Sequence, residues 1–176
     1  MEDESKISQQ QDLVPDSEKI SRTRTTKQRG ESAEIAFLYK ASNLGFGVAK
    51  PYGDSDRYDF ILSWDERLWR VQVKSTTHIC GRGYKISTHR TSKRGRVAYT
   101  PKEIDILVAY IVPREIYYVI PVAAVQGLKA LCLYPSGTKK SAGRFEQYRE
   151  AWHLMRPPAV PNPNDTLAKV LDPGVL

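Results

Sequence analysis

Four polar side chains in the first half of the chain have the types and spacing that metal-assisted hydrolysis requires. Glu34 falls in a segment with helical periodicity, and Asp59 falls in the first of two apolar runs. Gln72 and Lys74 stand two positions apart in the second run. Carboxylate and amide oxygens suit a hard cation such as Mg²⁺, which polarises a phosphate and lowers the pKa of a bound water. A nearby lysine can orient or deprotonate that water and stabilise negative charge in the transition state. This set of groups predicts the chemistry of phosphodiester hydrolysis.

A β-hairpin would bring three of these side chains together. The apolar runs 58–63 and 68–75 are separated by a short polar turn, which is typical of two antiparallel strands. Side chains alternate along a strand, so Gln72 and Lys74 should share one face of the second strand. Pairing of the two strands would then place Asp59 beside them.

The fourth side chain depends on a helix. Apolar residues at helical spacing predict a helix over 30–44, and Gly45 stands where a left-handed residue would end it. Packing of this helix on the sheet would bring Glu34 to the same point. Glu31, one turn earlier, is an alternative for the same role.

Each of the four residues also has an ordinary structural interpretation. Asp59 could satisfy backbone groups at a strand edge, and Lys74 could be an exposed strand lysine. Gln72 could pair across the sheet, and Glu34 could be a solvated helix residue. Their joint spacing favours the functional interpretation.

A long basic stretch follows the first strands. The net charge of the chain is +7, and no acidic residue occurs between Glu66 and Glu103. Such an excess of one sign predicts a polyanionic partner, because each neutralised phosphate releases counterions. A solvated charged surface is the alternative. We interpret 82–96 as a flexible basic flap that grips the backbone of DNA, through Arg82, Lys85, Arg90, Lys93, Arg94 and Arg96.

The remaining patterns predict an α/β sandwich around a mixed sheet. Further strands are expected at 46–49, 84–88, 104–112, 116–120 and 131–134, with a loop over 89–96. Further helices are expected at 121–129 and 144–155, the latter with a stripe of Phe145, Tyr148, Trp152 and Met155. The folded body would span 25–156, between a disordered arm at 1–24 and a Pro-rich tail at 157–176.

The candidate residues and their surroundings resemble the PD-(D/E)XK nuclease superfamily. The likeness is nearest to the branch that includes group I intron-encoded homing endonucleases, and it is carried by 30–34, 58–60, 71–74 and 117–121. The resemblance implies a restriction-endonuclease-like αβββαβ core with a mixed central sheet flanked by helices. It implies Asp59 as the central metal ligand, Gln72 as a neutral oxygen ligand and Lys74 as the water-activating residue. Glu34 would be the helix carboxylate, and Mg²⁺ or Mn²⁺ would be the cofactor.

Two departures from the family pattern leave alternatives open. Tyr58 stands where proline is usual, and Gln72 replaces the second acid, so the metal would meet one negative charge fewer. A DNA-binding relative without activity therefore remains an alternative, as does a Holliday-junction or repair nuclease. Because a duplex cut on both strands needs two active sites, we expect a dimer or a higher oligomer.

The composition also indicates where such a protein would act. No apolar run approaches the roughly 20 residues that span a bilayer, and the acidic first residues are unlike a secretory signal. Cys80 and Cys132 have no zinc-ligand spacing around them, and two thiols suit a reducing environment. We therefore expect a cytoplasmic protein with no membrane partner.

Overall fold

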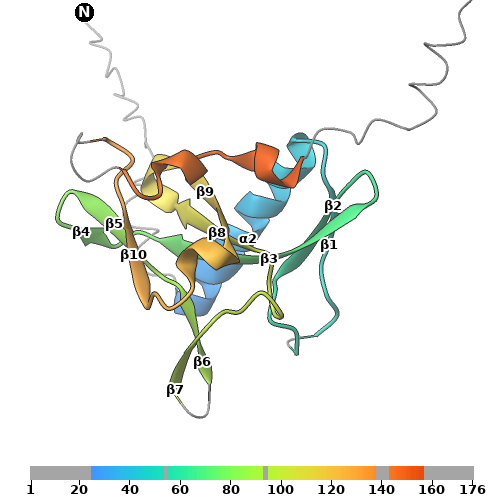
Figure 1. Ribbon diagram of the computed structural model, residues 1–176, viewed down its shortest axis with the longest axis horizontal. Coiled ribbons are helices and arrows are strands. Elements are labelled where there is room, and N and C mark those ends of the chain that lie inside the picture. The colour runs from blue at the N-terminus through green and yellow to red at the C-terminus, as the bar shows by residue number, and fades with distance from the viewer. Residues whose placement is uncertain (1–24, 54, 93–94, 138–142, 157–176) are drawn as a thin grey trace, which may run out of the picture.

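The computed structural model describes residues 25–156, apart from 54, 93–94 and 138–142. The arm predicted at 1–24 and the tail predicted at 157–176 lie outside the described residues. Within this part, a mixed five-stranded sheet has one long helix packed on one face (Figure 1). Its strands, in spatial order, are β1 (Gly47–Ala49), β2 (Phe60–Trp64), β3 (Arg67–Thr76), β8 (Ile106–Ile111) and β9 (Ile116–Pro121). Only β3 and β8 run parallel, and the other neighbours are antiparallel.

The helix α2 (Thr26–Asn43) confirms the predicted helix but begins four residues earlier. The reason is a capping box in which the side chains of Thr25 and Gln28 satisfy each other's backbone N–H groups. At the other end Gly45 has a φ of +86°, which glycine adopts without steric cost. The helix buries Ala33, Phe37 and Ala41 against the sheet.

The opposite face of the sheet is covered mainly by β structure. A three-stranded sheet joins β10 (Ala130–Leu133), β5 (Gly83–Ser87) and β4 (Ile79–Cys80). Ile86, Leu131 and Leu133 from this sheet pack with Leu107 and Ala109 of β8 in a second apolar cluster. The central sheet therefore separates two cores, one under α2 and one under the smaller sheet.

The prediction of a loop over 89–96 is wrong. The chain forms a two-stranded ladder of β6 (His89–Ser92) and β7 (Gly95–Ala98), which projects from the body as a hairpin (Figure 1). The sequence did not predict these strands because they contain few apolar residues. They need few, since neither face of the ladder packs in a large core.

The helix predicted over 121–129 is also wrong. Pro121 is the last residue of β9, and the chain then makes one 3₁₀ turn, η2 (Val122–Val125). Val122 and Val125 are buried, which anchors this single turn. Gly127 follows with a φ of +74°, so the helical path cannot continue.

The closing helix predicted over 144–155 is replaced by two 3₁₀ turns, η3 (Glu146–Tyr148) and η4 (Trp152–Met155). Between them Glu150 has a φ of +47° and pairs with β9 through its backbone N–H to Tyr117 O at 2.7 Å. Its carboxylate also accepts the Tyr117 N–H at 2.8 Å. The expected stripe is consequently divided, with Phe145 and Tyr148 in the second cluster and Trp152 and Met155 in the first.

The predicted α/β class with a mixed central sheet is confirmed, as are all seven strands expected from apolar runs. The order αβββαβ differs at one point. In the described part of the connection between β3 and β8, strands β4 to β7 stand where the second helix was expected. No described helix is both long and apolar enough to cross a membrane.

Candidate active site

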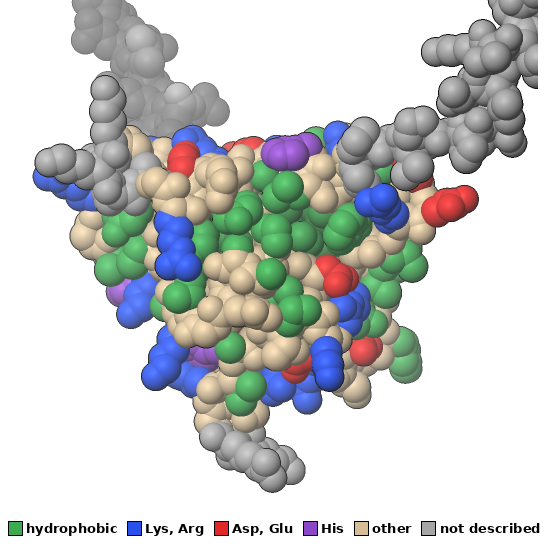
Figure 2. Space-filling model, viewed as in Figure 1, with side chains coloured by type: hydrophobic (Ala, Val, Ile, Leu, Met, Phe, Trp, Pro, Cys, Tyr) green, Lys and Arg blue, Asp and Glu red, His purple; other side chains and the backbone are tan. Residues whose placement is uncertain are grey.

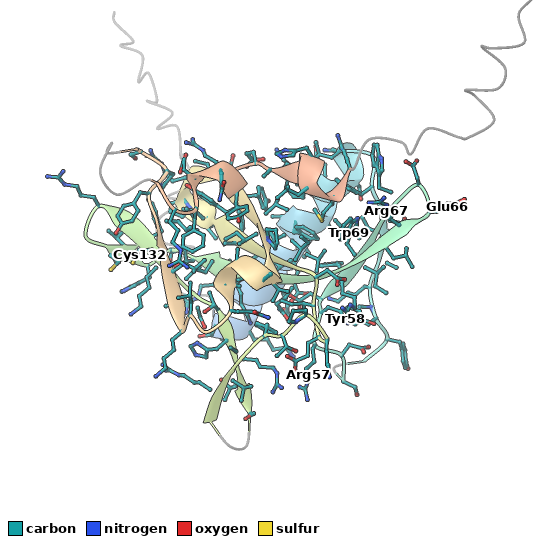
Figure 3. The ribbon with its side chains drawn as sticks, in the orientation of Figure 1. Arg57, Tyr58, Glu66, Arg67, Trp69 and Cys132 are labelled. Atoms are coloured by element: carbon teal, nitrogen blue, oxygen red, sulfur yellow. The ribbon has the colours of Figure 1, made fainter. Side chains whose placement is uncertain are left out.

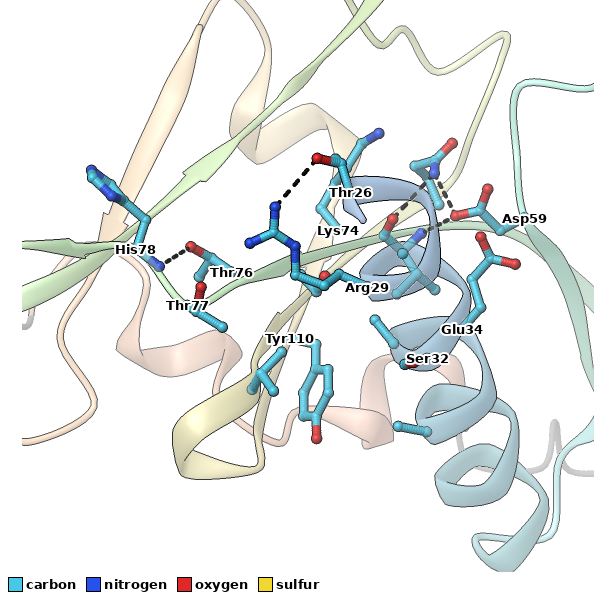
Figure 4. A pocket seen from close by; sticks show the side chains of 17 residues that line it. Thr26, Arg29, Ser32, Glu34, Asp59, Lys74, Thr76, Thr77, His78 and Tyr110 are labelled. Carbon is cyan, nitrogen blue, oxygen red and sulfur yellow. Dashed lines mark hydrogen bonds between the residues drawn. The ribbon is translucent and has the colours of Figure 1, made fainter. Parts of the chain in front are cut away.

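A cavity of about 890 Å³ lies between the first half of α2 and the second half of β3 (Figure 4). The residues that line it include all four of the predicted catalytic side chains: Glu34, Asp59, Gln72 and Lys74. Glu34 and Asp59 lie close together at one end of the cavity, and His78 lies at the other end. The convergence that the sequence required is therefore present.

Asp59 is fixed where the pairing of β2 with β3 stops. Its N–H donates to Val71 O at 2.8 Å, which continues the ladder by one bond. Its side chain then turns toward β3, and Oδ2 accepts the N–H of Val73 at 2.8 Å. The carboxylate thus satisfies a backbone donor that an adjoining strand would otherwise have paired.

Gln72 and Lys74 point to the face opposite α2, and they line the cavity at the edge of β3 that β2 leaves unpaired beyond Val71. Their cross-strand partners, Leu107 and Ala109, belong to the second apolar cluster, whereas Val73 packs in the cluster beneath α2. The side-chain amide of Gln72 donates to Asp59 Oδ2 and, at 3.2 Å, to Val73 O. The amide and the carboxylate therefore share one small polar centre.

Glu34 reaches the same centre from the helix. β2 begins only at Phe60, so the edge of β3 beyond it leaves room for a side chain from α2. Glu34 is 26% exposed and accepts a hydrogen bond from Lys50 Nζ at 2.8 Å. Glu31 is 55% exposed, pairs with Lys27 at 3.9 Å and does not line the cavity. Of the two candidate helix acids, the geometry places Glu34 at the cavity.

The charged groups in the cavity are incompletely compensated. Burial raises the pKa of Asp59, and the negative charge of Glu34 raises it further. The Val73 N–H, Lys74 and Gln72 lower this pKa but do not cancel the increase. Burial lowers the pKa of Lys74, although both carboxylates favour its charged form. Groups shifted by burial and by specific charges in a cavity are typical of functional sites.

The donor set fits a hard divalent cation. A cation beside Asp59 and Glu34 would offset the repulsion that raises the Asp59 pKa. The Gln72 amide faces Asp59 with its nitrogen, so it would present its oxygen to a cation there after a half-turn of the amide group. Mg²⁺ needs only one or two carboxylates because it retains waters and binds substrate phosphate. Across the described residues no three His, Cys, Asp or Glu side chains group closely enough to hold a metal ion by themselves.

The predicted DNA-contacting residues divide into three groups. Arg82, Lys85 and Arg96 are exposed, on the turn after β4, on β5 and on β7. Lys93 and Arg94 lie outside the described residues. Figure 2 shows Lys and Arg side chains on both sides of the hairpin base, a surface suited to a polyanion.

Arg90 differs from the exposed arginines. Its side chain is 21% exposed, and its Nη2 donates to Glu103 Oε1 at 2.8 Å. This ion pair ties the hairpin to the body, so the structure gives Arg90 a structural contact in place of a free surface charge.

Sequence reasoning missed several residues at the site. Lys50 contacts Glu34 because β1, which directly precedes Lys50, packs beside α2. No sequence pattern predicted this contact. Arg29 lines the cavity from the first turn of α2. Arg57 is exposed near the base of the β6–β7 hairpin (Figure 3), where its charge acts on Tyr99. The only available signal for Arg57 was its position two residues before Asp59.

A model of the PD-(D/E)XK endonuclease family matches residues 24–155. The chain belongs to this family, which confirms the resemblance seen in its sequence motifs. It is an endonuclease with a restriction-endonuclease-like fold.

Comparison with solved structures adds a relative in the expected branch. The chain is similar to a bacterial homing endonuclease, I-Ssp6803I, with a TM-score of 0.68 and 32% sequence identity, over 76% of this chain and 95% of that one. A weaker likeness, to MepB, has a TM-score of 0.40 and 16% identity over 58% of this chain and 83% of that one. No curated protein sequence matches the chain.

Proposed function

We propose that this endonuclease hydrolyses DNA phosphodiester bonds in a reaction that depends on Mg²⁺ or Mn²⁺. The observation that carries the proposal is the convergence of Glu34, Asp59, Gln72 and Lys74 on one cavity. The similarity to a bacterial homing endonuclease supports cleavage of duplex DNA.

In the proposed mechanism Asp59 and Glu34 would hold the cation, and the Gln72 amide, which now donates to Asp59 through its nitrogen, would turn its oxygen toward the ion. A bound divalent ion would supply Lewis-acid polarisation of the phosphate and a water of lowered pKa. The Val73 N–H keeps the Asp59 carboxylate aimed into the cavity. The Lys50 ammonium on Glu34 keeps that side chain extended toward the same end.

Lys74 orients the attacking water and stabilises the negative charge that develops on the phosphate. Its ammonium is largely removed from bulk solvent, which strengthens its electrostatic effect on a nearby oxyanion. Its position two residues after Gln72 places it on the same face as the amide. A phosphate bound in the cavity beside the Gln72 amide would therefore be within reach of Lys74.

The basic surface would hold the DNA backbone. Arg82, Lys85 and Arg96, which lie after β4, on β5 and on β7, are exposed and available to phosphates. These contacts would position the duplex without selecting its sequence.

We further propose that the enzyme acts as a homo-oligomer, because a cut through both strands needs two active sites. Ile35, Leu38 and Tyr39 form an exposed apolar stripe on α2, at the i, i+3, i+4 spacing of one helix face. A second copy packed there would cover the stripe. Light scattering should give a multiple of 20.0 kDa for the native protein and a smaller mass for Leu38→Glu. A monomeric native protein contradicts this part of the proposal.

The test of the main function is plasmid cleavage with Mg²⁺ or Mn²⁺. The native protein should cut, and Lys74→Ala should lose at least about 100-fold in rate, as when a transition-state charge donor is removed. Lys102→Ala, an exposed lysine outside the cavity, is the matched control and should cut normally. Cleavage that survives Lys74→Ala contradicts the mechanism.

The second candidate is a DNA-binding module of the same fold that has lost activity. Gln72 favours it, because an amide in place of a second acid weakens the attraction for a cation. Metal-independent retention of DNA in a shift assay, with no cutting by the native protein in either metal, would establish this candidate.

A further inference from the structure

Tyr99 is a buried aromatic residue at the base of the β6–β7 hairpin, immediately after β7. It is 4% exposed and packs in the second apolar cluster, on the face to which Gln72 and Lys74 point. Lys74 Nζ lies over its ring, 5.6 Å from the centroid. This distance is within the range of a cation–π contact, in which the ring face attracts the ammonium.

The backbone around Tyr99 is held in place by Glu103. The Glu103 carboxylate accepts hydrogen bonds from Arg90 at 2.8 Å and from the N–H and hydroxyl of Thr100 at 3.0 and 3.1 Å. Burial raises the pKa of Glu103, but these donors outweigh burial and lower it. The ring is therefore carried on a clamped segment rather than on a free loop.

Lys74 needs such a partner because two carboxylates are near it. The charges of Asp59 and Glu34 both act on Lys74, and its side chain is long and flexible. Nevertheless, among the described residues Lys74 makes no ion pair with either carboxylate. Lys50 already occupies one oxygen of Glu34. A direct pair with Lys74 would occupy a further oxygen that a cation needs and would withdraw the Lys74 ammonium from the substrate.

We propose that Tyr99 is a positioning residue, whose ring face holds the Lys74 ammonium in the cavity and apart from the Asp59 and Glu34 carboxylates. The ring suits this task because it attracts a cation without accepting a proton from it. The hairpin thereby gains a second role, since its base carries the residue that orients Lys74. This inference rests on the proposed function, in which Lys74 acts on the phosphate.

The first test compares Tyr99→Phe, which keeps the ring, with Tyr99→Leu, which removes it. Single-turnover cleavage rates and DNA affinity are measured for both, the affinity without cleavage in Ca²⁺. Tyr99→Leu should cut roughly 3- to 30-fold more slowly with little change in affinity, and Tyr99→Phe should stay within about twofold of the native rate. Leu133→Ala, which leaves a hole in the same cluster away from the cavity, is the control for destabilisation and should keep the native rate.

The second test does not depend on activity. Protons on the ε-carbon of Lys74 should resonate upfield because of the ring, and Lys74→Arg identifies the signal. The shift should persist in Tyr99→Phe and disappear in Tyr99→Leu. If Tyr99→Leu does not fold, Glu103→Gln serves instead, because it loosens the clamp without altering the ring; it should reduce both the upfield shift and the rate.

The outcomes separate the two proposals. If cleavage by the native enzyme depends on Lys74 but Tyr99→Leu leaves both the rate and the signal unchanged, only the role of Tyr99 is overturned. Equal losses in Tyr99→Phe and Tyr99→Leu would also overturn it, because the hydroxyl and not the ring would then matter. Absence of cutting by the native protein, or full activity of Lys74→Ala, overturns the proposed function.

Discussion

Two aspartates, Asp59 and Asp105, occupy equivalent places on opposite edges of β3. Each directly precedes a strand that flanks β3, which is β2 for Asp59 and β8 for Asp105. Each carboxylate accepts a backbone N–H of β3 where the ladder ends, from Val73 at 2.8 Å and from Arg70 at 2.7 Å. The backbone therefore uses the two residues in the same way.

The two carboxylates differ in what else surrounds them. Asp105 also accepts from the Arg70 guanidinium at 2.8 and 3.1 Å; burial raises its pKa, but Arg70 outweighs burial and lowers it. Burial raises the pKa of Asp59, and the charge of Glu34 raises it further. The side chain that donates to Asp59 is the neutral Gln72, which lowers this pKa too little to reverse the shift. Arg70 therefore compensates Asp105, which stabilises the fold, whereas the Asp59 carboxylate lacks such a partner, as the proposed role of a cation ligand requires.

The largest expected effect separates the two aspartates by activity. Asp59→Asn should reduce cleavage by at least about 100-fold, because a cation ligand is lost. The free energy of unfolding of the metal-free protein should not fall, since the substitution removes a buried charge that Glu34 repels. Cleavage assays and urea unfolding in EDTA measure the two quantities. A variant that cuts normally would remove Asp59 from the site.

The next effect concerns stability. Asp105→Asn should lower the free energy of unfolding by about 1–2 kcal/mol near neutral pH, because charged hydrogen bonds to Arg70 are lost at a partly exposed site. A lowered folded pKa contributes stability above the unfolded pKa, and this is lost as pH falls through the folded pKa. The difference from the native protein should therefore vanish in strong acid. Urea unfolding across acid pH tests this, and a gap that is constant with pH contradicts it.

A smaller effect is expected from adding the missing acid beside Asp59. Gln72→Glu should tighten Mg²⁺ binding by about tenfold, since the cation then meets a further carboxylate. Without metal the same variant should be less stable than the native protein, because three carboxylates then share the cavity. Calorimetric titration with Mg²⁺ measures the affinity, and Gln72→Met is the control that removes the amide oxygen. Equal affinities in all three proteins would exclude this residue from the metal site.

The smallest effect extends the comparison to paired and unpaired arginines. Arg96→Gln should weaken DNA binding a few-fold, because Arg96 is exposed and free to contact a phosphate. The slope of the logarithm of DNA affinity against the logarithm of salt concentration should fall by about the value for one phosphate contact. Arg90→Gln should chiefly reduce stability, because Arg90 is paired with Glu103. DNA-shift assays over a salt series, together with thermal unfolding, distinguish these outcomes. If Arg90→Gln weakened DNA binding and Arg96→Gln reduced stability, the distinction between a paired Arg90 and a DNA-contacting Arg96 would be wrong.

The sequence by itself determined the local parts of the site. Two apolar runs around a short turn predicted the β2–β3 hairpin, and alternation along β3 placed Gln72 and Lys74 on the same face. Helical spacing and Gly45 predicted most of α2. These features depend on residues close in sequence, whose geometry a strand or a helix fixes.

Only the tertiary structure decided the contacts between distant segments. Glu34 reaches the cavity in preference to Glu31 because of how α2 packs against β3, and helical periodicity alone is compatible with both. Long-range pairing with β9 replaced the helix predicted over 144–155 by two turns. Tyr99 lies under Lys74 because it is buried in the second apolar cluster at the base of a hairpin that the Arg90–Glu103 ion pair ties to the body. In each case the deciding free energy comes from contacts across the chain, which local propensity does not contain.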